Sequence, residues 1–176
     1  MTGLLRLLAP RYRVRAVTQL SAERLRAWQI DALMLDLDNT LVQWGGSSPP
    51  APVQEWMAGL HHRGVPACLV SNTLSDRVLR VAELLGVPYA RGRFKPSASK
   101  LRHALAILGT PRDRTAMVGD QLFTDILAGN RLGVPTVLTL PLACGEPLRM
   151  IPTRRLERHV LAMLERRGLA PGAPEV

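Results

Sequence analysis

Short runs of apolar residues alternate with longer amphipathic segments along this chain. One apolar run at 32–35 ends at Asp36, a second at 65–70 ends at Ser71, and a third at 115–118 is followed by Gly119 and Asp120. Short continuous apolar runs predict strands buried on both faces. Two further strands are expected at 87–90 and 136–140.

The segments between these runs have the spacing and the end signals of helices. Helices are expected at 53–63, 75–85, 97–108, just after Asp120 to about residue 128, and from 153 to near 168. Ser75 and Ser97 suit helix starts, while Gly64, Gly86 and Gly109 suit helix ends. Strands alternating with helices indicate an α/β fold: a three-layer, Rossmann-like arrangement around a central parallel sheet.

In open parallel sheets, ligands bind at the carboxyl ends of the strands. Asp36, Ser71 and Asp120 each stand just after an expected strand. We therefore expect these three polar side chains to meet in one crevice.

The length of 176 residues fits one domain. We expect it to span residues 1–168, with 1–31 as an N-terminal extension that packs on the core and 169–176 as a flexible tail. A hydrophobic content of 47% indicates a globular chain and not a disordered one.

The net charge of +9 favours anionic partners: nucleic acid, acidic lipid headgroups or phosphorylated substrates. Of the 23 basic residues, 21 are Arg and only Lys95 and Lys100 are Lys. A GC-rich coding sequence explains such a bias equally well. Under that explanation the two retained lysines are informative, because Lys and Arg are not interchangeable at a tight site.

Nothing in the sequence predicts export or membrane insertion. Cys68 and Cys144 have neither metal-ligand nor disulfide spacing, which suits a reducing cytoplasm. No secretory signal is visible, and the longest apolar stretch, 132–144, is shorter than the ~20 residues of a membrane-spanning helix. A cytoplasmic protein without a transmembrane segment is expected, with peripheral contact at the inner face of the membrane left open.

Two carboxylates, Asp36 and Asp38, stand two residues apart at the first strand end. In extended backbone, residues i and i+2 share a side, so both can face one reacting group. Phosphoryl transfer through a covalent intermediate needs a carboxylate nucleophile and a proton donor for the leaving oxygen. Asp36 suits the first role and Asp38 the second. The alternative is a solvated loop that happens to contain two acids.

Polar groups at the later strand ends suit a phosphate and a cation. Ser71 and Asn72 offer donors for phosphoryl oxygens, although such residues are also common in turns. Lys95 can bring a cation, although most lysines simply lie on the surface. Asp120 is either a Mg²⁺ ligand or a helix cap, and Asp125 is either a further ligand or the residue that positions Lys95. The Asp38 main-chain carbonyl completes a Mg²⁺ site with Asp36 and Asp120.

The order of these motifs resembles the four-motif signature of the haloacid dehalogenase (HAD) superfamily, subfamily IIIA. The resemblance to the YqeG family of bacterial phosphatases extends over residues 1–168. It is carried by Leu8-Ala9-Pro10, LDLDNTLV at 35–42, Trp44, Val70-Ser71-Asn72, Lys95-Pro96, GDQLFTD at 119–125 and Gly129-Asn130-Arg131. That family is similar to the mitochondrial phosphatidylglycerophosphate phosphatases.

The resemblance implies a phosphoaspartyl enzyme with a five-stranded core and Asp36 on its central strand. It implies that Asp36 attacks phosphorus and that Asp38 protonates the leaving alcohol and then activates water. Ser71 and Lys95 would bind the phosphoryl group, and Asp120 would position Mg²⁺.

The spacing leaves no room for a large cap domain over the site. Only 34 residues separate Asp36 from Ser71, and 23 separate Ser71 from Lys95. An open site favours a bulky or surface-anchored substrate, and phosphatidylglycerophosphate is the best single guess. Arginines near both ends could dock on anionic lipid, or form only a solvated basic face, and they include Arg13, Arg154, Arg155 and Arg158. Trp44 could line the entrance or pack at its rim. The oligomeric state is left open.

Two alternatives compete with a lipid phosphatase. The same chemistry could act on a soluble or nucleic-acid phosphomonoester. A non-catalytic module that binds RNA or an acidic partner is less favoured, since it would have no need for Asp36, Asp38, Lys95 and Asp120 together. RNA modules also use stacking aromatic residues, which make up only 4% of this chain.

Overall fold

A parallel five-stranded sheet forms the centre of the molecule in the computed structural model, which describes residues 2–73, 76–142 and 147–172. Its strands are β1 (Tyr12–Val14), β2 (Ala32–Leu35), β3 (Ala67–Leu69), β4 (Thr115–Gly119) and β5 (Thr136–Thr139). They lie in the order β1-β5-β4-β2-β3, and each neighbouring pair is parallel. The α/β class expected from the sequence is therefore confirmed.

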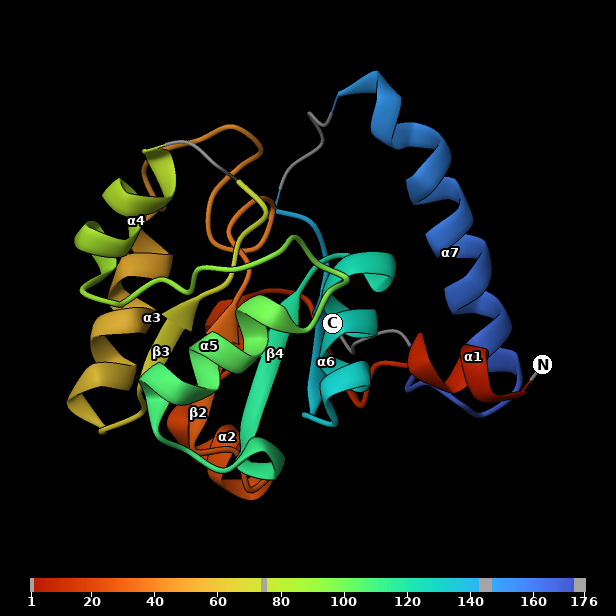
Figure 1. Ribbon diagram of the computed structural model, residues 1–176, viewed down its shortest axis with the longest axis horizontal. Coiled ribbons are helices and arrows are strands. Elements are labelled where there is room, and N and C mark those ends of the chain that lie inside the picture. Colours follow the sequence, from red (N-terminus) through yellow and green to blue (C-terminus); the bar gives the residue numbers. More distant parts are fainter. Residues whose placement is uncertain (1, 74–75, 143–146, 173–176) are drawn as a thin grey trace.

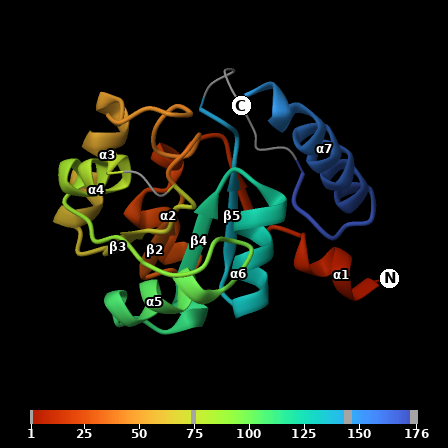
Figure 2. The ribbon, with the colours of Figure 1, turned by 45° about the horizontal axis from the view of Figure 1, so that its top comes forward.

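Helices cover both faces of this sheet (Figures 1 and 2). The helices are α1 (Thr2–Leu7), α2 (Ala22–Ala27), α3 (Ala51–His62), α4 (Arg77–Leu85), α5 (Ser99–Leu108), α6 (Leu127–Leu132) and α7 (Ile151–Arg166). Short helical turns lie at Val17–Gln19, Arg112–Arg114 and Leu148–Met150, and a π-helical turn, η3 (Leu122–Ile126), leads into α6.

Alternate residues of β2 feed two different cores. Leu33 and Leu35 pack with residues of α2, α3 and α4, whereas Met34 packs on the other side with residues of α5 and α6. Both patterns follow from the two-residue period of a strand. Full burial of each such side chain contributes roughly 1.5–3 kcal/mol, so the two cores fix the sheet between its helical layers.

Helix α7 lies at the end of the molecule opposite α3 and α4, beyond β5 (Figures 1 and 2). Val160 and Leu161 of this helix pack against a small apolar cluster formed by Leu122, Ile126 and Leu138. The helix is therefore held to the sheet by a satellite cluster and not by the main core.

The strand that carries Asp36 is not the central one, contrary to the expectation from the resemblance. The expected strand at 87–90 makes only a single bridge, between Tyr89 and Leu69. Instead β1, which was not predicted, pairs with β5 at the opposite edge, so β4 becomes the middle strand. With a full strand at 87–90 and without β1, β2 would lie at the centre.

Predicted helix ends agree well where a glycine marks them. Gly86 and Gly109 both have φ of 64° and follow α4 and α5 directly. This left-handed conformation is one that glycine adopts without the steric cost of a Cβ. Helix starts agree less well: α5 begins at Ser99, and the predicted cap Ser75 lies outside the described residues, as does Cys144.

The structure has no large cap domain in its described part, in agreement with the spacing of the motifs. A single helix, α3, lies between β2 and β3, and α4 follows β3. None of the helices in the residues described combines the length and the apolar character needed to cross a bilayer.

Candidate active site

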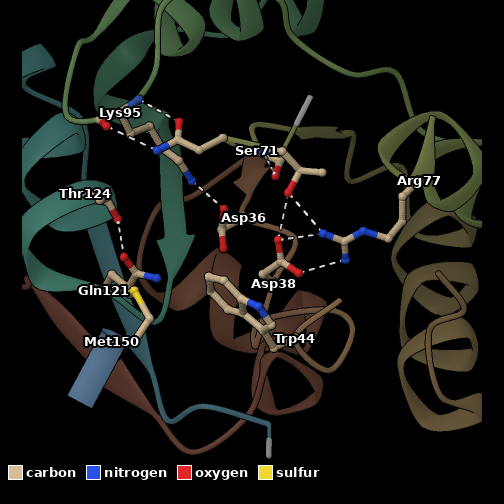
Figure 3. A pocket seen from close by; sticks show the side chains of 11 residues that line it. Asp36, Asp38, Trp44, Ser71, Arg77, Lys95, Gln121, Thr124 and Met150 are labelled. Carbon is tan, nitrogen blue, oxygen red and sulfur yellow. Dashed lines mark hydrogen bonds and ion pairs between the residues drawn. The ribbon is translucent and has the colours of Figure 1, made fainter. Parts of the chain in front are cut away.

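A cleft of about 280 Å³ opens at the carboxyl ends of β2, β3 and β4 (Figure 3). It is lined by Asp36, Asp38, Trp44, Ser71, Asn72, Thr73, Arg77, Lys95, Gln121, Thr124 and Met150. Of the three side chains expected to share a crevice, Asp36 and Ser71 line this cleft together with Trp44, whereas Asp120 does not line it. Asp120 and Asp125 do not line this cleft themselves, but their carboxylates lie close to that of Asp36.

The ammonium group of Lys95 lies between two buried carboxylates. Its Nζ is 2.5 Å from Asp36 Oδ1 and 2.6 Å from Asp125 Oδ1. Burial alone would lower the pKa of Lys95, but the charges of Asp125 and Asp36 outweigh it and raise that pKa, so Lys95 stays protonated. Burial also raises the pKa of Asp36 to about 7, against the pull of Lys95 and with the repulsion of Asp125.

Carboxylate oxygens of Asp36, Asp120 and Asp125 lie within 4.8 Å of one another. All three side chains are buried, and the pKa of Asp120 is raised, first by burial and then by the two other carboxylates. Asp120 Oδ1 has no hydrogen-bond partner, an unusual state for a buried carboxylate oxygen. A compact set of oxygen ligands with one unused lone-pair acceptor fits a hard divalent cation such as Mg²⁺.

Asp38 turns its carboxylate toward the start of α4. Arg77 binds it in a two-pronged ion pair, Thr73 Oγ1 donates a hydrogen bond to Oδ2 at 2.8 Å, and the Gly45 main-chain N–H donates to Oδ1 at 3.1 Å. Burial would raise the pKa of Asp38, but these donors outweigh it and lower that pKa. Asp38 is therefore ionised in this conformation.

Ser71 and Asn72 follow β3 and take different positions in the cleft. Ser71 Oγ accepts a hydrogen bond from the Thr73 main-chain N–H at 3.1 Å. The Asn72 side chain accepts from the Lys95 main-chain N–H at 2.7 Å and donates to the Lys95 carbonyl oxygen at 3.1 Å. Asn72 thus fastens the loop that carries Lys95, and its side-chain amide is already engaged there.

The turn after β2 brings Trp44 back to the cleft that Asp36 and Asp38 line. Asn39 has φ of 59°, a left-handed conformation that Asn tolerates better than most residues. Its side-chain Oδ1 accepts a hydrogen bond from the Trp44 main-chain N–H at 3.2 Å, and its own N–H donates to Val42 at 2.7 Å. The chain therefore curls back directly after Asp38, which places Trp44 at the cleft.

Several residues at the site were not identified from the sequence. Arg77 pairs with Asp38, and buried Lys100 donates a hydrogen bond from Nζ to the Ser71 carbonyl oxygen. Glu157 of α7 is buried and accepts from the Phe123 main-chain N–H at 3.0 Å. Only Lys100 gave a signal, as one of two lysines in an Arg-rich chain.

Two arginines considered for a basic outer face turn inward instead. Arg154 of α7 binds the Asp120 carboxylate and main-chain oxygen, and also Glu157. Arg13 of β1 binds Glu165 of α7. These ion pairs tie α7 to the sheet and to the carboxylate cluster. Because Arg154 and Arg13 are engaged there, the basic face is smaller than the sequence alone indicates.

Comparison with known families and proteins gives one consistent result. A family model described as HAD-hydrolase-like matches residues 93–141. The chain is 31% identical to a Bacillus subtilis protein named "Probable phosphatase YqeG", over 88% of this chain and 90% of the relative.

A second relative is "Phosphatidylglycerophosphate phosphatase 1, chloroplastic" of Chlamydomonas reinhardtii. It is 31% identical over 85% of this chain and 59% of its own length. A crystal structure of a HAD family hydrolase from Deinococcus radiodurans, with bound phosphate and sodium, superposes with a TM-score of 0.52. It is 18% identical and covers 82% of this chain and 99% of that one, so it is similar in fold.

Proposed function

The chain belongs to the YqeG family of HAD-type phosphatases, and from that premise we propose that it is a Mg²⁺-dependent phosphomonoesterase acting on phosphatidylglycerophosphate. The observation that carries the chemistry is the buried position of Asp36 beside Lys95, in a cleft that also contains Asp38. A carboxylate, a fixed cation and a second carboxylate are the groups that this reaction needs.

Asp36 is the nucleophile in this proposal. One of its carboxylate oxygens attacks phosphorus and forms an aspartyl phosphate, while the substrate alcohol leaves. Lys95 stays charged next to Asp36 and lowers the energy of the negative phosphoryl oxygens. Ser71 lines the same cleft and offers a hydroxyl donor to the phosphoryl group.

Asp38 acts first as the general acid and then as the general base in this proposal. It protonates the leaving alcohol, and the resulting carboxylate then takes a proton from the water that hydrolyses the aspartyl phosphate. In the structure Asp38 is ionised and bound to Arg77, so it must turn away from Arg77 and gain a proton before it can act as the acid.

Asp36, Asp120 and the Asp38 main-chain carbonyl would hold Mg²⁺, and Asp125 positions Lys95 or adds a ligand. The bound cation would neutralise charge on the phosphoryl oxygens. The raised pKa values of Asp36 and Asp120 support this assignment, because three buried carboxylates are more than the adjacent Lys95 and Arg154 neutralise.

The substrate assignment is supported by three features. The cleft has no large cap in the described residues, so a bulky substrate can reach it. The net charge of +9 favours binding to an anionic membrane surface. The Chlamydomonas relative carries the name of a phosphatidylglycerophosphate phosphatase.

The test is phosphate release from phosphatidylglycerophosphate in mixed micelles, with soluble phosphomonoesters alongside, with Mg²⁺ or with EDTA. Asp36→Asn is the control for the nucleophile. Lipid turnover that is lost in the variant and in EDTA would support the full proposal. Better turnover of soluble or nucleic-acid esters would keep the mechanism and remove the lipid. Absence of any turnover, with RNA binding unchanged in Asp36→Asn, would favour a binding module.

A further inference from the structure

A second and larger depression lies between β5 and α7. It has a volume of about 650 Å³, within the roughly 300–1,000 Å³ that small-molecule sites occupy. Its apolar lining includes Leu122, Leu138, Leu140, Leu142, Ile151 and Leu161. We call it the α7 groove. In contrast to the cleft at Asp36, it is suited to hydrocarbon.

The α7 groove adjoins the catalytic cleft through two pairs of consecutive residues. Asp120 lines the groove and Gln121 lines the cleft; Ile151 lines the groove and Met150 lines the cleft. Asp120 also belongs to the carboxylate cluster around Asp36. The cleft and the α7 groove therefore share two stretches of wall.

Exposed apolar side chains gather along the same two segments. Leu140 is 46% exposed and Ile151 is 40% exposed, and both line the α7 groove. Leu148, three residues before Ile151, is 82% exposed. Single exposed leucines are ordinary, but a group of them beside an apolar groove indicates a surface with an apolar partner.

The charged residues of the groove suit an amphiphile that carries a phosphodiester. Arg13 and Arg154 are bound to carboxylates. Arg158 also lines the groove, is exposed, and makes no ion pair with any residue in the described part of the chain. An apolar wall with one available cation complements an acyl chain joined to a phosphodiester.

We propose that the α7 groove binds an acyl chain of the lipid substrate while its terminal phosphomonoester lies at Asp36. Arg158 supplies the cation for the phosphodiester between the two. This inference rests on the proposed function, since it assumes that the phosphate enters the cleft. It makes α7 the element that selects a lipid over a soluble ester.

Photocrosslinking tests the location of the chain without any turnover. Asp36→Asn is mixed with micelles of phosphatidylglycerophosphate that carries a diazirine in one acyl chain, illuminated, and mapped by mass spectrometry. Crosslinks are expected in segments 138–142 and 151–161. Crosslinks concentrated on exposed Leu79 and Leu84 of α4, or spread over the surface, would overturn the proposal. A stable dimer in lipid-free solution that protects segments 138–142 and 151–161 would also overturn it, because a second copy of the chain would then fill the groove.

Chain-length dependence provides the functional test. The ratio of kcat/KM for long-chain over short-chain phosphatidylglycerophosphate is measured in the wild type and in the double variant Leu140→Gln, Ile151→Gln. We expect the ratio to fall about ten-fold, the effect of leaving roughly two methylenes unburied. Leu156→Gln is the matched control, since Leu156 is also on α7 and 54% exposed but does not line the groove.

The outcomes separate the two proposals. A ratio that falls no further in the double variant than in Leu156→Gln overturns the groove assignment, while Asp36-dependent hydrolysis of the short-chain ester keeps the proposed function. Hydrolysis of neither ester overturns the proposed function, and the crosslinking map alone then decides whether the groove binds lipid.

Discussion

The guanidinium group of Arg77 and the carboxylate of Asp38 form a two-pronged ion pair, with nitrogen–oxygen distances of 2.8 and 2.9 Å. Arg77 is the first residue of α4, and its NH1 also donates to the Gly46 carbonyl oxygen at 2.7 Å. One side chain therefore links α4, the Asp38 carboxylate and the loop after β2. This geometry explains why the pKa of Asp38 is lowered in spite of its burial.

Replacing Arg77 by Met should destabilise the protein. The change leaves a largely buried carboxylate with fewer donors, which costs about 1–3 kcal/mol of unfolding free energy at neutral pH. Because the folded-state pKa of Asp38 lies below its ordinary value of 3.8, its stabilisation is present above that value and is lost as pH falls. The gap between wild type and variant in urea unfolding should therefore close in strong acid. An equal loss in Arg80→Met, an exposed neighbour on α4, would refute this account.

Gly119→Ala should disturb the carboxylate cluster. A Cβ at this position would overlap the Asp125 carboxylate and lie 2.6 Å from the Asp125 Cβ, closer than real Cβ contacts come. Asp125 would have to move, and Lys95 would lose one of its two anionic partners. We expect at least a ten-fold fall in kcat/KM for any substrate that is turned over, since a displacement of about 1 Å can cost 10²-fold. Gly59→Ala in α3, where a Cβ meets nothing, should keep activity and slightly raise Tm.

The sequence predicts which side chains gather at this edge of the sheet, because strand ends are a local signal. Each of Asp36, Ser71 and Asp120 follows an apolar run, and a parallel sheet brings such positions to one edge. β1 gave no comparable signal: it is three residues long, has Arg13 at its centre, and is defined by pairing with β5 about 125 residues later.

The residues that support the site could not be found in this way. Arg77, Lys100 and Arg154 have surface-type side chains whose partners lie 29 to 39 positions away in the chain. Arg154 stands in the basic, amphipathic helix α7, where a solvated face is the ordinary expectation. Only the approach of α7 to β4 turns this arginine toward Asp120.

Asp36→Asn should stabilise the protein in the absence of metal. The pKa of Asp36 is raised from 3.8 to about 7, so between these values the native state binds more protons than the unfolded chain. Stability therefore falls as pH rises across that window, and an Asn side chain avoids the loss. In EDTA, Tm of the variant should exceed that of the wild type at about pH 8, and the difference should shrink toward about pH 5. A constant difference at both pH values would exclude this electrostatic origin.

Mg²⁺ should raise the Tm of the wild type, and Asp120→Asn should abolish that shift. A ligand that binds only the native state stabilises it by about 2.7 kcal/mol at one hundred times its Kd, or roughly 5–11 °C for a chain of this size. Asp120 Oδ1 is a buried acceptor without a hydrogen-bond partner, and the Asn amide would offer a weaker ligand there. Asp113→Asn, at an exposed carboxylate, is the control. A Mg²⁺ shift that survives in Asp120→Asn would place the cation elsewhere.

Lys100→Met should weaken phosphate binding, although Lys100 itself does not line the cleft at Asp36. Buried Lys100 donates from Nζ to the Ser71 carbonyl oxygen and lies 5.1 Å from the centre of the Phe94 ring. Burial and the charge of Lys95 lower the pKa of Lys100, so its position near the site has an electrostatic cost. Methionine retains most of the stem but leaves the Ser71 carbonyl without its donor, at about 1–3 kcal/mol.

The loop at Ser71 should then shift, and KM for phosphomonoesters should rise about ten-fold with a smaller change in kcat. Arg102→Met, at an exposed position of α5, should leave both constants unchanged. If Lys100→Met lowered Tm but left KM at the wild-type value, Lys100 would serve only the packing of α5. The presence of a lysine at this position in an Arg-rich chain would then have no connection with phosphate binding.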